Sequence, residues 1–370
     1  MTAGIYVHVP FCFSKCRYCG FVSFPYDKER PLLYREAVLR EMTDAAGKSG
    51  GVCFGSVYFG GGTPTCLDRE DLVFLLRRVG DLFCVLPGAE TTVEANPETV
   101  DGAYLHSLLQ AGVNRISLGA QTFDPSLLDL LGRQAGPAVV RRAVRAARQA
   151  GFTNLSMDLI FGLPGQTPFV HRQTLEQALD LEPEHISAYG LELIAGTPLA
   201  RAVAEGSLAP CGEEEALAMY EETIAVLTRA GYRHYEISNF ARPGYECRHN
   251  LIYWENGEYL GFGPAAASHW RGGRRQNADS MEAYLRGEGI AEEGADRSRE
   301  MTDTILMGLR LLEGLDLAAF ADRFGVSLES SYGQTLAWVR RQGLAEVKGE
   351  RLRLTARGLP LANEVFRAFV

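Results

Sequence analysis

The sequence contains no run of eighteen or more apolar residues, so it predicts no transmembrane helix. Residues 1–10 also lack the basic segment, apolar run and small-residue cleavage site of a signal peptide. We therefore expect a cytoplasmic protein. A basic excess is missing too, because 37 Lys and Arg stand against 46 Asp and Glu, a formal net charge of −9. This balance argues against nucleic acid as a partner, since neutralising phosphates requires a basic surface.

Cysteine is sparse, with eight residues in 370, and no internal repeat or low-complexity tract is present. In a cytoplasmic chain of this length, cysteines are more typical of metal ligands or reduced buried thiols than of disulfides. Four of them have no partner at ligand spacing, and we interpret them as packing or incidental residues: Cys53, Cys66, Cys84 and Cys211.

Residues 1–240 alternate between short apolar stretches and longer amphipathic ones, which predicts an α/β fold with a parallel sheet and helices outside it. The short connections favour a partial (βα)6 TIM-like barrel over a Rossmann sheet. The expected strands are 5–9, 56–59, 91–94, 115–118, 154–160 and 185–191. The expected helices between them include 33–46, 69–79, 103–111, 138–150 and 170–181.

Beyond residue 240 the pattern changes, which predicts two further regions. Residues 241–297 are irregular and rich in aromatics, glycine and histidine; we expect them to pack on the barrel and to end in a linker at 287–297. Residues 298–370 read as a small winged-helix-like α+β domain, with three helices, a hairpin at 344–347 and 351–354, and a closing helix.

Unusual polar residues stand where the predicted strands end. Residues 10–19 follow the first strand and 60–65 the second, while Glu94, Gln121 and Asp158 belong to later strands. Because parallel strands present their carboxyl ends on one face, these segments are expected to converge on one mouth. Some of the glycines there are explained by their preference for turns. That preference does not explain why Cys, Glu, Gln and Asp occur at the same position relative to the strand ends.

Cys12, Cys16 and Cys19 form a C-x3-C-x2-C pattern. A structural zinc site or a ferredoxin-type cluster requires a fourth ligand, and the chain has none at suitable spacing. Three thiolates on a four-iron cluster leave one iron open to a substrate. The triplet therefore predicts an iron–sulfur cluster with an open coordination position.

This triplet after a first strand, with a glycine-rich segment after the second, resembles the radical-SAM superfamily. The resemblance implies a [4Fe-4S] cluster whose open iron is chelated by S-adenosylmethionine (SAM), within a full or three-quarter barrel. Five ordered motifs are similar to the oxygen-independent coproporphyrinogen III oxidase family: Tyr-Val-His-Val-Pro-Phe-Cys at 6–12, Gly-Gly-Gly-Thr-Pro-Thr at 60–65, Val-Glu-Ala-Asn-Pro at 93–97, Arg-Ile-Ser-Leu-Gly-Ala-Gln at 115–121 and Asp-Leu-Ile-Phe-Gly-Leu-Pro at 158–164.

By that resemblance, nine positions match SAM-binding residues: Tyr6, Tyr18, Gly61, Gly62, Thr63, Glu94, Gln121, Arg133 and Asp158. Glycines allow the backbone to approach the ligand, and carboxylates and amides can bond ribose hydroxyls and an amino group. Glu94 and Asp158 stand at buried strand positions, where a carboxylate requires a ligand or partner. Arg133, taken without the resemblance, would be interpreted as a solvated surface residue.

Two departures from the oxidase pattern favour another branch. Oxidases of the family carry a further cysteine two residues after the third, where this chain has Phe21. The motif His-Asn-x-x-Tyr-Trp at 249–254 is similar to the HemW branch, whose members are heme chaperones. That branch implies heme as cargo, a haem-dependent respiratory enzyme as acceptor, and heme contacts from His249, Asn250, Tyr253 and Trp254. The alternatives are coproporphyrinogen oxidation and another radical-SAM reaction on tetrapyrroles, such as heme degradation.

The residues of that motif leave two interpretations open. His249 is a candidate axial ligand of heme iron, and Tyr253 and Trp254 could cover a porphyrin face. Alternatively, His249 and Asn250 are hydrogen-bonded loop residues and Trp254 fills an interface with the C-terminal region. Cys247 is a rival soft ligand. The sequence leaves open SAM cleavage, covalent heme attachment, a homodimer and a peripheral membrane encounter through the acceptor.

Overall fold

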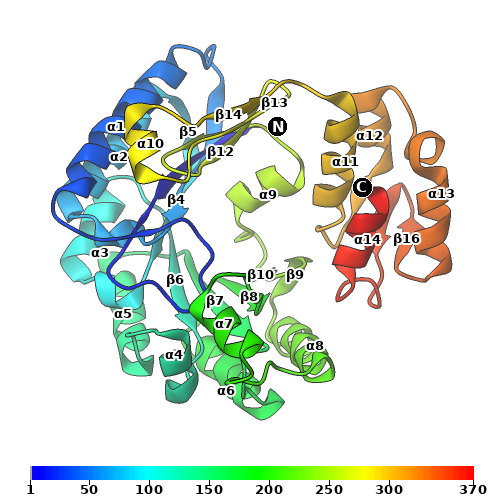
Figure 1. Ribbon diagram of the computed structural model, residues 1–370, viewed down its shortest axis with the longest axis horizontal. Coiled ribbons are helices and arrows are strands. Elements are labelled where there is room, and N and C mark those ends of the chain that lie inside the picture. Colours follow the sequence, from blue (N-terminus) through cyan, green and yellow to red (C-terminus); the bar gives the residue numbers. More distant parts are fainter. Residues whose placement is uncertain (1) are drawn as a thin grey trace.

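The computed structural model describes residues 2–370 and is built on one twelve-stranded sheet, ordered β14-β13-β12-β11-β1-β4-β5-β6-β7-β8-β10-β9. Six neighbouring strands run parallel, as predicted, and the sheet curves into a partial barrel (Figure 1). These strands are β1 (Ala3–Val9), β4 (Cys53–Gly61), β5 (Cys84–Ala95), β6 (Arg115–Gln121), β7 (Leu155–Phe161) and β8 (His185–Gly190).

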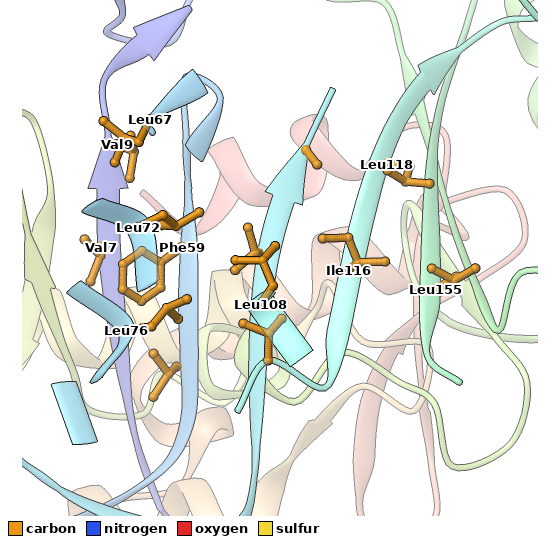
Figure 2. Close-up of a cluster of buried hydrophobic side chains, with 14 of the residues drawn as sticks. Val7, Val9, Phe59, Leu67, Leu72, Leu76, Leu108, Ile116, Leu118 and Leu155 are labelled. Carbon is orange, nitrogen blue, oxygen red and sulfur yellow. The ribbon is translucent and has the colours of Figure 1, made fainter. Parts of the chain in front are cut away.

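Helices cover the outer face of the sheet, and the main hydrophobic core lies between them and the strands (Figure 2). Val7, Phe59 and Ile116 point outward from their strands and pack with Leu72 and Leu108 of the helices. Removing this apolar surface from water is the main stabilising contribution. The helices are α1 (Arg30–Ala46), α2 (Arg69–Leu82), α3 (Gly102–Gln110), α4 (Pro125–Leu131), α5 (Pro137–Ala150), α6 (Pro168–Leu179), α7 (Pro198–Ala204) and α8 (Glu213–Arg229).

One disulfide joins Cys53 and Cys84, with a Cα–Cα distance of 4.6 Å. The interpretation of these two cysteines as packing or incidental residues was wrong. They are the first residues of β4 and β5 and face each other in the parallel register, although 31 residues separate them. Strand β5 also begins at Cys84 rather than at residue 91, so the sequence pattern gave no indication of this pairing. Cys66 and Cys211 are free thiols.

Residues 241–297 extend the main sheet, and the prediction of an irregular region ending in a linker at 287–297 was wrong. Strand β11 (Tyr259–Phe262) lies parallel to β1, and β12 (Ala267–Trp270), β13 (Gly273–Gln276) and β14 (Ala291–Glu293) continue antiparallel to the sheet edge. These strands are three or four residues long, too short to show a period of two in the sequence. The other edge ends in β10 (Asn239–Ala241) and β9 (Arg233–Glu236).

Helix α9 (Arg248–Trp254) lies between the two edges of the sheet, close to β1 and β4 (Figure 1). It carries the His-Asn-x-x-Tyr-Trp motif, so these residues are helical and do not form a loop. Helix α10 (Met281–Arg286) packs on α1 on the outer side. Near the mouth, the short strands β2 (Phe11–Cys12) and β3 (Phe24–Pro25) pair with each other, and two 3-10 turns, Pro64–Cys66 and Pro97–Thr99, follow β4 and β5.

Residues after 296 form a C-terminal unit with a hydrophobic core of its own, which includes Ile305, Phe320, Leu336, Leu352 and Val365. A three-stranded sheet gives it the predicted wing, with Gly349 in the left-handed conformation at the hairpin turn. Its elements are α11 (Arg297–Gly308), β15 (Leu315–Asp316), α12 (Leu317–Phe324), α13 (Leu328–Arg341), β16 (Ala345–Lys348), β17 (Arg351–Leu354) and α14 (Ala362–Phe369). None of the helices in residues 2–370 is long and apolar enough to cross a membrane.

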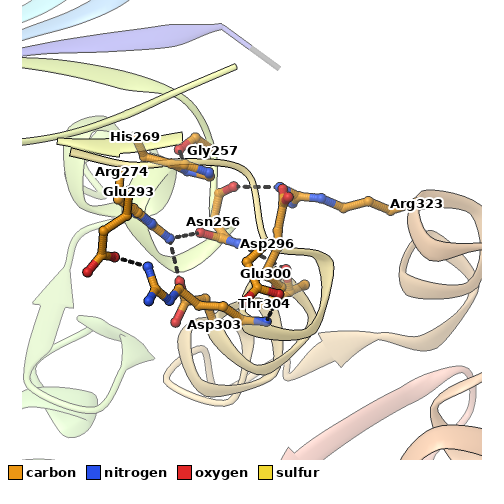
Figure 3. Close-up of polar contacts among 11 residues, drawn as sticks. Asn256, Gly257, His269, Arg274, Glu293, Asp296, Glu300, Asp303, Thr304 and Arg323 are labelled. Atoms are coloured by element: carbon orange, nitrogen blue, oxygen red, sulfur yellow. Dashed lines mark hydrogen bonds and ion pairs between the residues drawn. The ribbon is translucent and has the colours of Figure 1, made fainter. Parts of the chain in front are cut away.

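A polar network attaches this unit to the end of α9 (Figure 3). The side chain of Asn256 donates to Thr304 Oγ1 at 3.0 Å and accepts from Arg274 at 2.7 Å. Arg274 also bonds Asp303 at 2.8 Å, and Arg323 donates to the Asn256 carbonyl at 3.2 Å. One residue, through its side-chain amide and its backbone carbonyl, therefore connects the sheet with α11 and α12.

Candidate functional site at the barrel mouth

The three clustered cysteines lie on the loop that follows β1, and all three thiols are free. Cys12 ends β2, where its Sγ lies 3.6 Å from Thr63 Oγ1, and Cys16 receives an N–H of Arg133 at 3.5 Å. Burial raises the pKa of the Cys12 and Cys19 thiols. Thiolates in such surroundings are favoured by a bound metal.

This donor set fits an iron–sulfur cluster better than a single metal ion. Throughout residues 2–370, no three His, Cys, Asp or Glu side chains converge on one point that could hold an ion. A cubane cluster takes each thiolate on a different iron, so its three cysteines stand apart around it. The loop therefore presents three thiols of the right chemistry and leaves a fourth iron without a protein thiol.

The glycine-rich turn after β4 packs directly on the cysteine loop. Gly62 N donates to the Val9 carbonyl at 2.9 Å, and Thr63 N donates to the Phe11 carbonyl at 2.7 Å. A Cβ at Gly62 would lie 2.7 Å from the Phe11 carbonyl oxygen, and one at Gly61, where φ is +111°, would lie 2.5 Å from the His8 ring. These glycines are required because the backbone approaches the loop closely.

Glu94 and Asp158 face an internal cavity of about 240 Å³ in the barrel lumen. Glu94 accepts hydrogen bonds from Tyr58 OH at 2.8 Å and Gly61 N at 3.1 Å, and Asp158 accepts from Ser117 Oγ at 3.1 Å. Burial, and then the neighbouring Asp158, raise the pKa of Glu94 to about 7. Both carboxylates are half-buried and their exposed surface faces this cavity, and burial also raises the pKa of Asp158. The two carboxylates thus have the hydrogen-bond partners that their predicted burial requires, and the cavity beside them leaves space for a ligand.

Arg133 lies against the cysteine loop and is not a solvated surface residue. Gly132, left-handed at φ +71°, ends α4 and turns the chain so that Arg133 can donate to the Gly119 carbonyl at 2.6 Å. Gln121 at the end of β6 has φ +65°, a conformation that residues other than glycine rarely adopt. Tyr18 packs on a hydrophobic cluster that includes Leu131, and Tyr6 OH lies 3.1 Å from His8 Nδ1. The nine SAM candidates therefore fall into a lumen group (Tyr6, Glu94 and Asp158) and a group beside the cysteine loop (Tyr18, Gly61, Gly62, Thr63, Gln121 and Arg133).

The four residues of the α9 motif lie in two different places. His249, 1% exposed, has both ring nitrogens engaged, Nδ1 with Ser56 Oγ and Nε2 with Tyr253 OH, each at 2.9 Å. Burial lowers the pKa of His249 to about 3. Asn250 and Tyr253 line the lumen cavity with His249, whereas Trp254 lines a separate cleft beside the C-terminal unit.

Cys247, the rival ligand, is buried at the start of α9. Its Sγ lies 3.5 Å from Glu90 Oε1, and burial raises the pKa of the thiol to about 12. Neither Cys247 nor His249 presents a free donor atom to the mouth.

Arg115 is a lumen residue that sequence reasoning did not single out. It is fully buried, lines the same cavity as Glu94 and Asp158, and its Nε has no hydrogen-bond partner within residues 2–370. The alternation of side chains along β6 could have indicated it, because residues 115, 117, 119 and 121 share one face of the strand and Gln121 was already a candidate. The cavity is also lined by Tyr58, Ser117, Ser187 and Tyr189.

Comparisons with known proteins agree with this geometry. Residues 6–178 match the Radical SAM superfamily, and residues 296–361 match the HemN C-terminal domain. The heme chaperone HemW of Bacillus subtilis is 35% identical over 99% of this chain and 98% of its own length, and that of Escherichia coli is 37% identical over 71% and 69%. The structure of coproporphyrinogen III oxidase (HemN) from Escherichia coli superposes with a TM-score of 0.86 at 24% identity, covering 100% of this chain and 90% of that one.

Proposed function

Because the chain belongs to the HemW family within the radical SAM superfamily, we propose that it is a cytoplasmic heme chaperone that transfers heme to a haem-dependent respiratory enzyme. The end-to-end match to relatives named as heme chaperones carries this proposal. The similarity to coproporphyrinogen III oxidase supports the fold alone.

The mouth of the barrel has the residues to hold a [4Fe-4S] cluster with exchangeable SAM. Cys12, Cys16 and Cys19 would bind three irons, and the cluster, when bound, offers an open iron to the amino and carboxylate groups of SAM. Arg133 places a positive charge beside Cys16, which stabilises a thiolate there. Glu94 and Asp158 accept hydrogen bonds at the lumen side, where a ribose or amino group would need acceptors.

Phe21 supports a carrier over an oxidase. It stands where the oxidases of the family have their additional cysteine, and its side chain is 67% exposed beside the cysteine loop. A phenyl ring cannot replace a thiol as a ligand or as a redox group.

Anaerobic reconstitution followed by two parallel assays tests the proposal. Heme titration should give a saturable Soret shift at one heme per chain, and coproporphyrinogen III should not be decarboxylated in the presence of SAM and reductant. Turnover without a specific Soret shift would establish the oxidase instead.

A further inference from the structure

A cavity of about 840 Å³ lies between the barrel and the C-terminal unit, and α9 contributes residues both to it and to the lumen cavity. Helix α9 itself lies between these two parts of the molecule (Figure 1). The barrel contributes the beginning of β1 at Ala3 and the α9 residues Leu251 and Trp254. The C-terminal unit contributes Leu315 and Phe320. The polar network of Asn256 fixes one wall, because Asn256, Thr304 and Arg323 all line the cleft (Figure 3).

We propose that this cleft, and not the lumen, holds the porphyrin of the heme; the proposal rests on the heme-chaperone function proposed above. Ligand pockets for molecules of this class measure about 300–1,000 Å³ and are largely apolar. The cleft falls within that range, whereas the polar lumen cavity of about 240 Å³ falls below it. Of the two cavities that His249, Asn250, Tyr253 and Trp254 line, the cleft beside Trp254 therefore has the space for a macrocycle.

Trp254 provides an observation independent of volume. Its indole N–H is buried and, among the described residues, has no acceptor, although a buried donor ordinarily finds one. The guanidinium of Arg310 lies 4.3 Å from the centre of its ring. An aromatic wall with an unused donor suits a planar ligand that carries acceptor groups at its edge.

Three arginines and five carboxylates line the cleft, and each arginine has more N–H donors than its ion pairs use. Arg233 pairs with Glu246 at 3.4 Å and with Glu313, while Arg351 pairs with Asp316 at 3.2 Å and donates to the Gly314 carbonyl at 3.1 Å. Each guanidinium has five N–H donors, so these pairs leave N–H groups available for the carboxylates of a porphyrin.

The cleft also offers no free strong ligand for iron. No His, Cys or Met is among the described side chains that line it, and the hydroxyl of Tyr235, which does line it, is engaged with His185 Nε2 at 2.8 Å and with Cys247 N at 3.3 Å. Binding there would come from the porphyrin ring and its carboxylates, and the iron would keep weak axial ligands. That arrangement suits a carrier, since a heme held without strong axial bonds can leave for an acceptor that supplies them.

Two probes and one matched pair of variants test the site. Full-length, cluster-reconstituted protein is titrated with heme and with iron-free protoporphyrin IX, followed by tryptophan fluorescence quenching and, for heme, the Soret band. The wild type should bind both with Kd values within about threefold of each other. Ala319→Trp, at an exposed position that lines the cleft, should raise both Kd values by about tenfold or more. Ala318→Trp, on the same helix but outside the cleft lining, should leave them unchanged.

Each other outcome has a definite meaning. Protoporphyrin binding about a hundredfold weaker than heme would show that iron ligation dominates, and would overturn the cleft site. Normal heme binding by Ala319→Trp, combined with loss of binding in His249→Ala, would overturn it in favour of the lumen face of α9. In both cases the chaperone function would stand. A wild type that binds neither porphyrin would overturn the chaperone function itself.

Discussion

The guanidinium of Arg133 lies 3.5 Å from the Sγ of Cys16, across 117 residues of sequence. A positive charge beside a cluster thiolate stabilises the reduced, more negative state, so it raises the reduction potential. Arg133→Met should therefore shift the potential of the reconstituted cluster to a more negative value. An anaerobic redox titration monitored by EPR measures this shift.

Arg145→Met is the matched control, because Arg145 lies exposed on α5 and has no role at the mouth. Its cluster potential should equal that of the wild type. Equal potentials in Arg133→Met and wild type, both with a full cluster, would contradict the role of Arg133.

Glu94 should make SAM binding depend on pH. Its pKa of about 7 means that the carboxylate is protonated in part at neutral pH, and only the ionised form accepts through both oxygens. SAM affinity should rise as the pH increases through about 7. Glu94→Gln should weaken binding by about 10- to 100-fold at high pH, the usual loss for a hydrogen bond to a charged group, and flatten the profile. Isothermal titration between about pH 6 and pH 8.5 measures both effects.

Glu94 should also make the folding stability depend on pH, but in the opposite direction: stability falls as the pH rises. The folded pKa lies above the ordinary value of 4.5, so the contribution of Glu94 to folding is fully present below pH 4.5 and is lost as the pH rises through about 7. Glu94→Gln should therefore gain stability relative to the wild type above pH 7 without SAM. If the difference in the free energy of unfolding between Glu94→Gln and the wild type did not vary with pH, Glu94 would have an ordinary pKa in the folded protein.

The sequence predicted the barrel because six strands with outward apolar residues and intervening amphipathic helices repeat at an even spacing. It could not predict β11 to β14, because strands this short show no period and their partners lie far along the chain. It placed Cys12, Glu94 and Asp158 at one mouth, since parallel strand ends must converge. It could not show that His249 and Trp254 face different cavities, since that depends on where α9 lies between the sheet edges.

Each cysteine of the triplet should be indispensable for the cluster. Cys12→Ser, Cys16→Ser and Cys19→Ser should each lose the absorption near about 400 nm that thiolate-ligated clusters show after anaerobic reconstitution. Cys211→Ser should keep it, because Cys211 is a free thiol outside the triplet, with its Sγ beside Gly212 and Glu215 and its side chain packed on a separate hydrophobic cluster. Measuring the iron content of each variant distinguishes loss of the cluster from a cluster that is retained with an altered spectrum. A full cluster in all three triplet variants would refute the assignment.

The disulfide between Cys53 and Cys84 should make folding stability depend on reductant. It closes a loop of 31 residues, for which the chain-entropy model gives a stabilisation of about 3–4 kcal/mol. Thermal unfolding of the oxidised wild type should shift to lower temperature when a reductant is added. The double variant Cys53→Ser, Cys84→Ser should unfold at the temperature of the reduced wild type with or without reductant. In a separate sample without reductant, thiol titration of chemically denatured, cluster-free wild type should find six reactive thiols, since six of its cysteines are free. Eight reactive thiols without any added reductant would show that the pair stays reduced under those conditions.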